Sequence, residues 1–86
     1  MMDLKTIHLG NMIKKELKAQ GRSVSWLART IHMERSSVYK IFERNSVDIV
    51  LLVRICLVMN HDFFKDISTK IRDNYEEISQ QFLNFQ

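Results

Sequence analysis

The chain has 86 residues, which is enough for one small domain with a single hydrophobic core and too few for two. It contains no proline and only two glycines, and 45% of its residues are apolar. Because so little interrupts a helix, this composition predicts an all-α fold. The net charge is +3, and the single cysteine excludes an intramolecular disulfide.

Positive charge is concentrated in the amino-terminal half. Residues 22–45 carry five basic and two acidic side chains, whereas residues 46–86 have a net charge of −2. Such an asymmetry suits a polyanionic partner and is equally compatible with an ordinary solvated surface.

The first ten residues lack the apolar run of a signal peptide, and no apolar stretch approaches the roughly 20 residues of a membrane span. We therefore expect a cytoplasmic protein.

The first half of the chain predicts three helices. Residues 6–20 form an amphipathic pattern that Gly21 ends. Ser23 is a suitable N-cap for a second, two-turn helix that ends near His32. After a tight corner at Met33, residues 34–42 place apolar side chains at the spacing of a third helix.

The second half predicts three more helices. Ser46 is expected to cap the fourth, with Asp48 in its first turn, where a negative charge favours the helix dipole. Residues 60–62 end it, and Asp62 caps a short fifth helix through Ile67. Residues 68–86 then place apolar side chains at spacings of four and three, which predicts a separate carboxy-terminal helix.

Residues 24–43 meet the steric conditions for two short helices that cross at a tight turn. Ala28 is small where the two helices approach most closely. His32 falls where the chain needs a positive φ, which glycine adopts most easily and histidine less so. Val38 and Ile41 are apolar, as is required for the second helix of the motif to pack on the core.

With these residues in place, the chain resembles the repressor/Cro superfamily, often called the Xre family, from about residue 4 to residue 67. The resemblance rests on Gly21, on Leu27-Ala28, on the run of residues 36–41 and on the later apolar pattern of residues 52–64. It implies a five-helix lambda-repressor-like DNA-binding domain over residues 1–67, with a helix-turn-helix at 24–43. We expect residues 68–86 to form a helical extension that could serve as a dimerisation element. The chain departs from the family at Val24, where glutamine often contacts phosphate, and at His32, which is usually glycine.

The resemblance implies a sequence-specific transcriptional regulator of the repressor type, from a bacterium, a phage or a mobile element. Its third helix would lie in the major groove of double-stranded DNA. The expected base contacts are Arg35, Ser36, Tyr39 and Lys40, with Arg35 reading guanine. The expected phosphate contacts are Arg22, Ser25, Ser37, Arg44 and Asn45.

The fourth predicted helix is apolar around almost its whole circumference, so it must be covered on every side. We expect one side, with Ile49, Leu52, Ile55, Cys56 and Met59, to face the core. The other side needs cover from the carboxy-terminal helix, either of the same chain or of a second copy in a homodimer. For the dimer, the expected interface comprises Val50, Val53, Leu57, Tyr75, Ile78 and Phe82.

Other classes of function find little support. The chain has no glycine-rich phosphate loop and no nucleophile elbow, so we expect no enzyme, cofactor or small-molecule substrate. The spacing of its histidines and of Cys56 matches no metal-ligand pattern. The main rival is a protein-interaction module that keeps this fold without binding DNA, and the antitoxin of a toxin–antitoxin pair is a further alternative.

Overall fold

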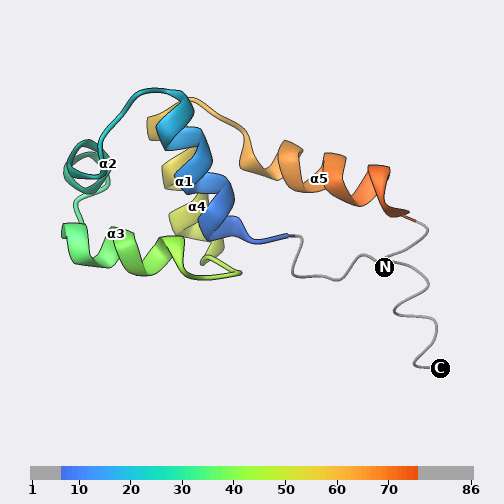
Figure 1. Cartoon of the computed structure of the whole chain (residues 1–86), viewed down its shortest axis with the longest axis horizontal. Coiled ribbons are helices and arrows are strands. Elements are labelled where there is room, and N and C mark those ends of the chain that lie inside the picture. The colour runs from blue at the N-terminus through green and yellow to red at the C-terminus, as the bar shows by residue number, and fades with distance from the viewer. Residues whose placement is uncertain (1–6, 76–86) are drawn as a thin grey trace.

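The computed structural model describes residues 7–75, and in this range it contains five helices and no strand. In Figure 1, α2 and α3 lie at one end of the molecule, and α5 extends away from the other helices toward the opposite end. The predicted all-α class is confirmed. The helices are α1 (Leu9–Ala19), α2 (Val24–Thr30), α3 (Arg35–Phe42), α4 (Ile49–Met59) and α5 (Phe63–Asp73).

One hydrophobic core joins all five helices, and α3 packs on both α1 and α2. α5 buries only Phe63, with the half-buried Ile67 packed against the core, which agrees with its projection from the body. The buried side chains are Leu9, Ile13, Leu17, Leu27, Ala28, Ile31, Val38, Ile41, Phe42, Leu52, Ile55, Met59 and Phe63.

The beginning of α1 rests directly on the end of α3. The amide N–H of Leu9 donates to the carbonyl of Asn45 at 3.0 Å, and that of Gly10 donates to the carbonyl of Arg44 at 2.9 Å. His8 caps the same turn, because its Nδ1 accepts from the amide of Asn11 at 3.0 Å. The first amides of α1, which have no partner within the helix, are therefore all bonded.

Gly10 makes this approach possible. A Cβ at this position would lie 2.6 Å from the carbonyl carbon of Phe42 and still closer to the carbonyl oxygens of Ile41 and Phe42. These are backbone atoms, which cannot turn aside as a flexible side chain can. Any residue other than glycine would therefore push α1 and α3 apart.

Three helices end in the same way, with one residue in the left-handed conformation. These residues are Gly21 after α1 (φ 69°), His32 after α2 (φ 58°) and Asn60 after α4 (φ 50°). In each case the next amide donates back into the last turn, from Arg22 to Leu17, from Met33 to Ala28 and from His61 to Cys56, at 3.1, 2.8 and 3.0 Å. This is the Schellman arrangement, which turns the chain sharply and satisfies the final carbonyls.

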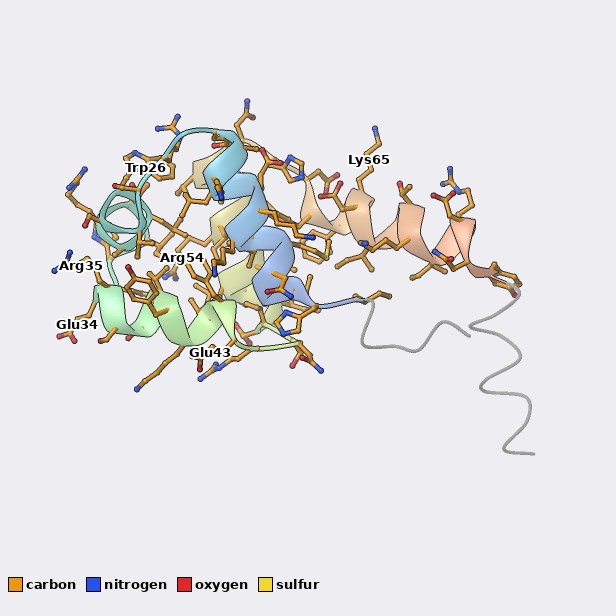
Figure 2. All side chains as sticks on the ribbon, viewed as in Figure 1. Trp26, Glu34, Arg35, Glu43, Arg54 and Lys65 are labelled. Carbon is orange, nitrogen blue, oxygen red and sulfur yellow. The ribbon has the colours of Figure 1, made fainter. Side chains whose placement is uncertain are left out.

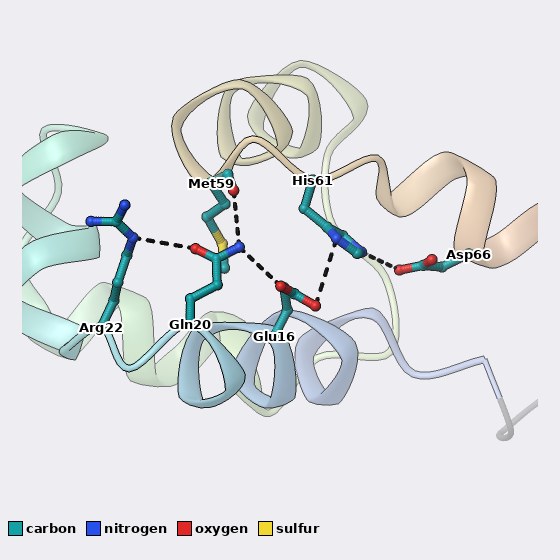
Figure 3. Close-up of polar contacts among 6 residues, drawn as sticks. All are labelled: Glu16, Gln20, Arg22, Met59, His61 and Asp66. Carbon is teal, nitrogen blue, oxygen red and sulfur yellow. Dashed lines mark hydrogen bonds and ion pairs between the residues drawn. The ribbon is translucent and has the colours of Figure 1, made fainter.

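A chain of polar contacts fastens α4 and α5 to α1 (Figure 3). Gln20 donates from Nε2 to the carbonyl of Met59 and to Glu16, both at 2.9 Å. The His61 ring lies between two carboxylates, with Nδ1 3.6 Å from Glu16 and Nε2 2.5 Å from Asp66. All of these groups are partly exposed, so the contacts orient α5 more than they stabilise the fold.

Two sequence predictions about the second half are wrong. Asp48, not Ser46, caps α4, since its side chain accepts from the amide of Leu51 at 3.1 Å, and the helix begins at Ile49. Asp62 caps α5 as expected, but the helix runs on to Asp73 instead of ending at Ile67. The expected boundary between residues 67 and 68 therefore falls inside one continuous helix.

The expected division of α4 is also partly wrong. Leu52, Ile55 and Met59 are buried as predicted, and Cys56 is half-buried, whereas Ile49 is 66% exposed. Ile49 is the first residue of α4 and lies one turn before Val53, on the face that points away from the core.

Replacement of Gly10 by alanine is expected to lower the free energy of unfolding by about 2–4 kcal/mol, because the new methyl group overlaps backbone that can move only with α3. Urea denaturation monitored by circular dichroism measures the change.

Gly21→Ala is the matched control. Gly21 has open space around its Cβ position and a positive φ, so the substitution should cost only about 1–2 kcal/mol of left-handed strain. Equal losses at the two glycines would contradict a steric role for Gly10.

Candidate nucleic-acid interface

The first helix of the candidate interface, α2, begins at a well-formed cap. The Ser23 hydroxyl accepts from the amide of Trp26 at 3.0 Å, as the sequence predicted. Leu27 and Ala28 are buried, whereas Ser25 and Trp26 are half-buried at the outer side of the helix. Val24 packs against the core cluster, so no polar side chain extends from this position toward a ligand.

The turn between α2 and α3 has the geometry that the sequence predicted. His32 adopts φ 58°, and the amide of Met33 donates to the carbonyl of Ala28 at 2.8 Å. Ala28 is only 4% exposed, and Ile31 at the end of α2 is fully buried. Figure 1 shows α2 nearly end-on and α3 lying across the view, so the two helices cross instead of running parallel.

α3 divides into a core side and an outer side. Val38, Ile41 and Phe42 are buried, which fixes the rotation of the helix about its own axis. All four residues expected to contact bases are exposed on the other side, and Tyr39 is 56% exposed with its ring edge-on to Phe42. These four residues are Arg35, Ser36, Tyr39 and Lys40.

The residues expected to hold phosphates lie on α2, on α3 and in the segments that precede α2 and follow α3. Arg22, Arg44 and Asn45 are exposed, while Ser25 and Ser37 are half-buried. The backbone carbonyls of Arg44 and Asn45 are bonded to α1, so their loop has a fixed position relative to α3. Arg35 connects the two sets of residues, since its Nη1 lies 3.5 Å from the hydroxyl of Ser25 on α2. A bond this long is weak and is easily exchanged for a ligand.

Arg22 and Trp26 form a second local unit. The Arg22 guanidinium lies 4.0 Å from the centre of the Trp26 ring, and its Nε donates to Gln20 at 3.2 Å. A guanidinium stacked on an indole keeps its charge and most of its donors free. Arg22 is therefore held in place while it can still bind an anion.

Two carboxylates at this surface, Glu34 and Glu43, were given no role in the sequence analysis. Glu34 precedes α3 and makes no capping bond, and Glu43 follows it; both are exposed. Glu43 lies one turn beyond Tyr39, so it shares the outer side of α3 with the candidate base contacts. Figure 2 shows Glu34 and Glu43 at the two ends of the helix. Projection of the sequence onto a helix would have revealed Glu43.

The cations of this surface have no carboxylate partner within residues 7–75. The ion pairs of this part of the chain are those of His61 with Glu16 and Asp66, which lie on the α1–α5 side. Arg22, Arg35, Lys40 and Arg44 can therefore bind an anion without first breaking an ion pair.

No group of three or more His, Cys, Asp or Glu side chains is placed to hold a metal ion in residues 7–75. None of the five described helices combines the length and the apolar character needed to cross a membrane.

Comparison of the chain with protein-family models, with curated proteins and with solved structures found no match.

The turn residue offers a direct test of the local geometry. A β-branched side chain is strained at positive φ, so His32→Val should be about 1–2 kcal/mol less stable than His32→Gly. The difference can be measured by thermal and urea unfolding of the two variants.

Arg29, exposed within α2, supplies the control pair. In a helix glycine is the poorer residue, so Arg29→Gly should be slightly less stable than Arg29→Val. The same order of stability at both positions would contradict a left-handed His32.

Proposed function

We propose that this protein is a sequence-specific DNA-binding regulator that uses α2 and α3 as a helix-turn-helix of the repressor/Cro type. α3 would lie in the major groove, with its outer side chains against base edges. The observation that carries the proposal is the rotation of α3, which buries Val38, Ile41 and Phe42 and leaves the exposed side to Arg35, Ser36, Tyr39 and Lys40.

Three further features support this function. The turn between the helices has the left-handed residue and the buried Ala28 that such a motif requires. Ser25, at the start of α2, lies within reach of Arg35, so phosphate and base contacts would be neighbours. The cations of this surface are free of ion pairs within the described residues, as phosphate binding needs.

Each candidate residue has a distinct role in the proposal. Arg35 reads guanine through a two-pronged hydrogen bond, and Lys40 binds a base or a phosphate. Arg22 and Arg44 bind phosphates on either side of the groove and set the register of α3. Glu43 either accepts from the amino group of cytosine or repels the phosphates, so it adds selectivity instead of general affinity.

The DNA contacts can be tested by fluorescence anisotropy with a duplex selected from a random pool by repeated binding to the wild-type protein. Arg35→Ala should reduce the preference for the selected duplex over a scrambled one by about 1–3 kcal/mol. Arg44→Ala should weaken both duplexes equally and lower the salt dependence by about one counterion, since it loses a phosphate contact.

Lys65→Ala provides the control, because Lys65 is exposed on α5, far from Arg35 in Figure 2. It should leave both affinities unchanged. If no duplex is enriched from the pool even at low salt, the proposed function is wrong.

Two observations favour the rival function, a protein-interaction module. Val24 packs on the core and provides no phosphate contact, and α4 exposes an apolar face. The rival predicts that a partner protein is retained by Arg35→Ala and lost when that face of α4 is made polar. Regulation through α3 predicts instead that Arg35→Ala reduces the preference for the selected duplex.

A further inference from the structure

α4 exposes a continuous apolar stripe along its length. Ile49, Val50, Val53 and Leu57 are 66%, 67%, 41% and 75% exposed. Their positions fall within an arc of about 100° on the helix, and they span about 12 Å along its axis. A stripe of this kind, with no polar side chain inside it, marks a surface that another apolar element covers. We call it the α4 stripe.

The direction of α5 decides where a cover can come from. α5 begins at Phe63, close to the Leu57 end of the α4 stripe, where Leu57, Asn60 and Asp62 border one hollow. It then leads away from the body for about 15 Å to Asp73. Tyr75, the last described residue, is 64% exposed beyond this end.

Residues 76–86, which lie outside the described residues, carry further apolar side chains, including Ile78 and Phe82. As a helix, these eleven residues would be about 16 Å long. A helix returning along α5 would end level with Phe63. Ile49 and Val50, at the far end of the α4 stripe, would stay uncovered by the same chain.

The charges of the two surfaces are complementary. Arg54 is exposed and borders the α4 stripe, next to Val50 and Leu57 on the helix surface. Residues 74–86 contain two acidic side chains, Glu76 and Glu77, and no lysine or arginine. The charges of residues 74–86 would therefore complement the arginine that borders the α4 stripe.

We propose that residues 76–86 of a second copy cover the α4 stripe, and that the exchange is reciprocal, which gives a two-fold homodimer. The expected interface is Val50, Val53, Leu57, Tyr75, Ile78 and Phe82, and the exposure of Ile49 adds this residue to it. The proposal does not depend on DNA binding, because it concerns the protein alone.

Sedimentation equilibrium without DNA tests the two surfaces separately. Leu57→Glu damages the stripe, and Ile78→Glu with Phe82→Glu damages the segment. Each variant should raise the dimer dissociation constant at least about 100-fold, because each places unpaired carboxylates against apolar groups. Tyr39→Glu, at a similarly exposed aromatic residue on α3, should leave the dimer intact. Circular dichroism confirms that each variant is folded.

Mixing the two damaged proteins distinguishes exchange between copies from every other arrangement. The Leu57→Glu protein has unchanged residues 76–86, and the Ile78→Glu, Phe82→Glu protein has an unchanged α4 stripe. The mixture should therefore form a heterodimer in which residues 76–86 of the first protein cover the α4 stripe of the second. Native mass spectrometry, with one protein labelled with ¹⁵N, identifies it by mass.

Reversal of charge supplies an independent measurement. Arg54→Glu should weaken the dimer at least about tenfold, and Glu76→Arg with Glu77→Arg in the same chain should restore it. Three results would overturn the proposal: a monomeric wild-type protein, a dimer that survives damage to residues 78 and 82, or damaged proteins that do not combine on mixing.

Discussion

The close contact between the beginning of α1 and the end of α3 is the constraint on which the structure depends. Gly10 allows the two backbones to meet, and the amides of Leu9 and Gly10 bond to the carbonyls that follow α3. Because backbone groups make this contact, it fixes α3 along its axis, while Val38, Ile41 and Phe42 fix its rotation. Packing therefore holds the exposed side of α3 in a fixed position, and a binding surface needs such rigidity.

The sharp helix ends extend this constraint to the rest of the molecule. Gly21, His32 and Asn60 each reverse the chain within a few residues, so short helices can surround one small core. His32 bears the greatest local strain and lies in the turn that sets α2 against α3. Strain is tolerated where the surrounding packing determines the conformation, as the buried Ala28 and Ile31 do here.

Local signals in the sequence predicted much of this fold. The caps at Ser23 and Asp62, the positive φ of His32 and the buried side of α3 follow from neighbouring residues alone, and the structure agrees. Asp48 was misplaced because serine and aspartate cap helices equally well. The need for glycine at position 10 depends on residues 41 and 42, which are remote in sequence, and no local pattern could reveal it. The sequence analysis ended the fifth helix at Ile67 and began another at residue 68, whereas α5 is one helix as far as Asp73. The part of α5 beyond Ile67 has no buried residue, so core packing gives no signal in the sequence for its end.

We propose that α3 and the beginning of α2 form the surface that binds DNA. The most direct measurement is an ¹H–¹⁵N correlation spectrum of the protein titrated with its selected duplex. If these helices bind DNA, the largest shifts should fall on the amides of residues 35–40 and 23–26, while the amide signals of α5 stay in place. Shifts confined to α4 and α5, with α3 unchanged, would contradict it.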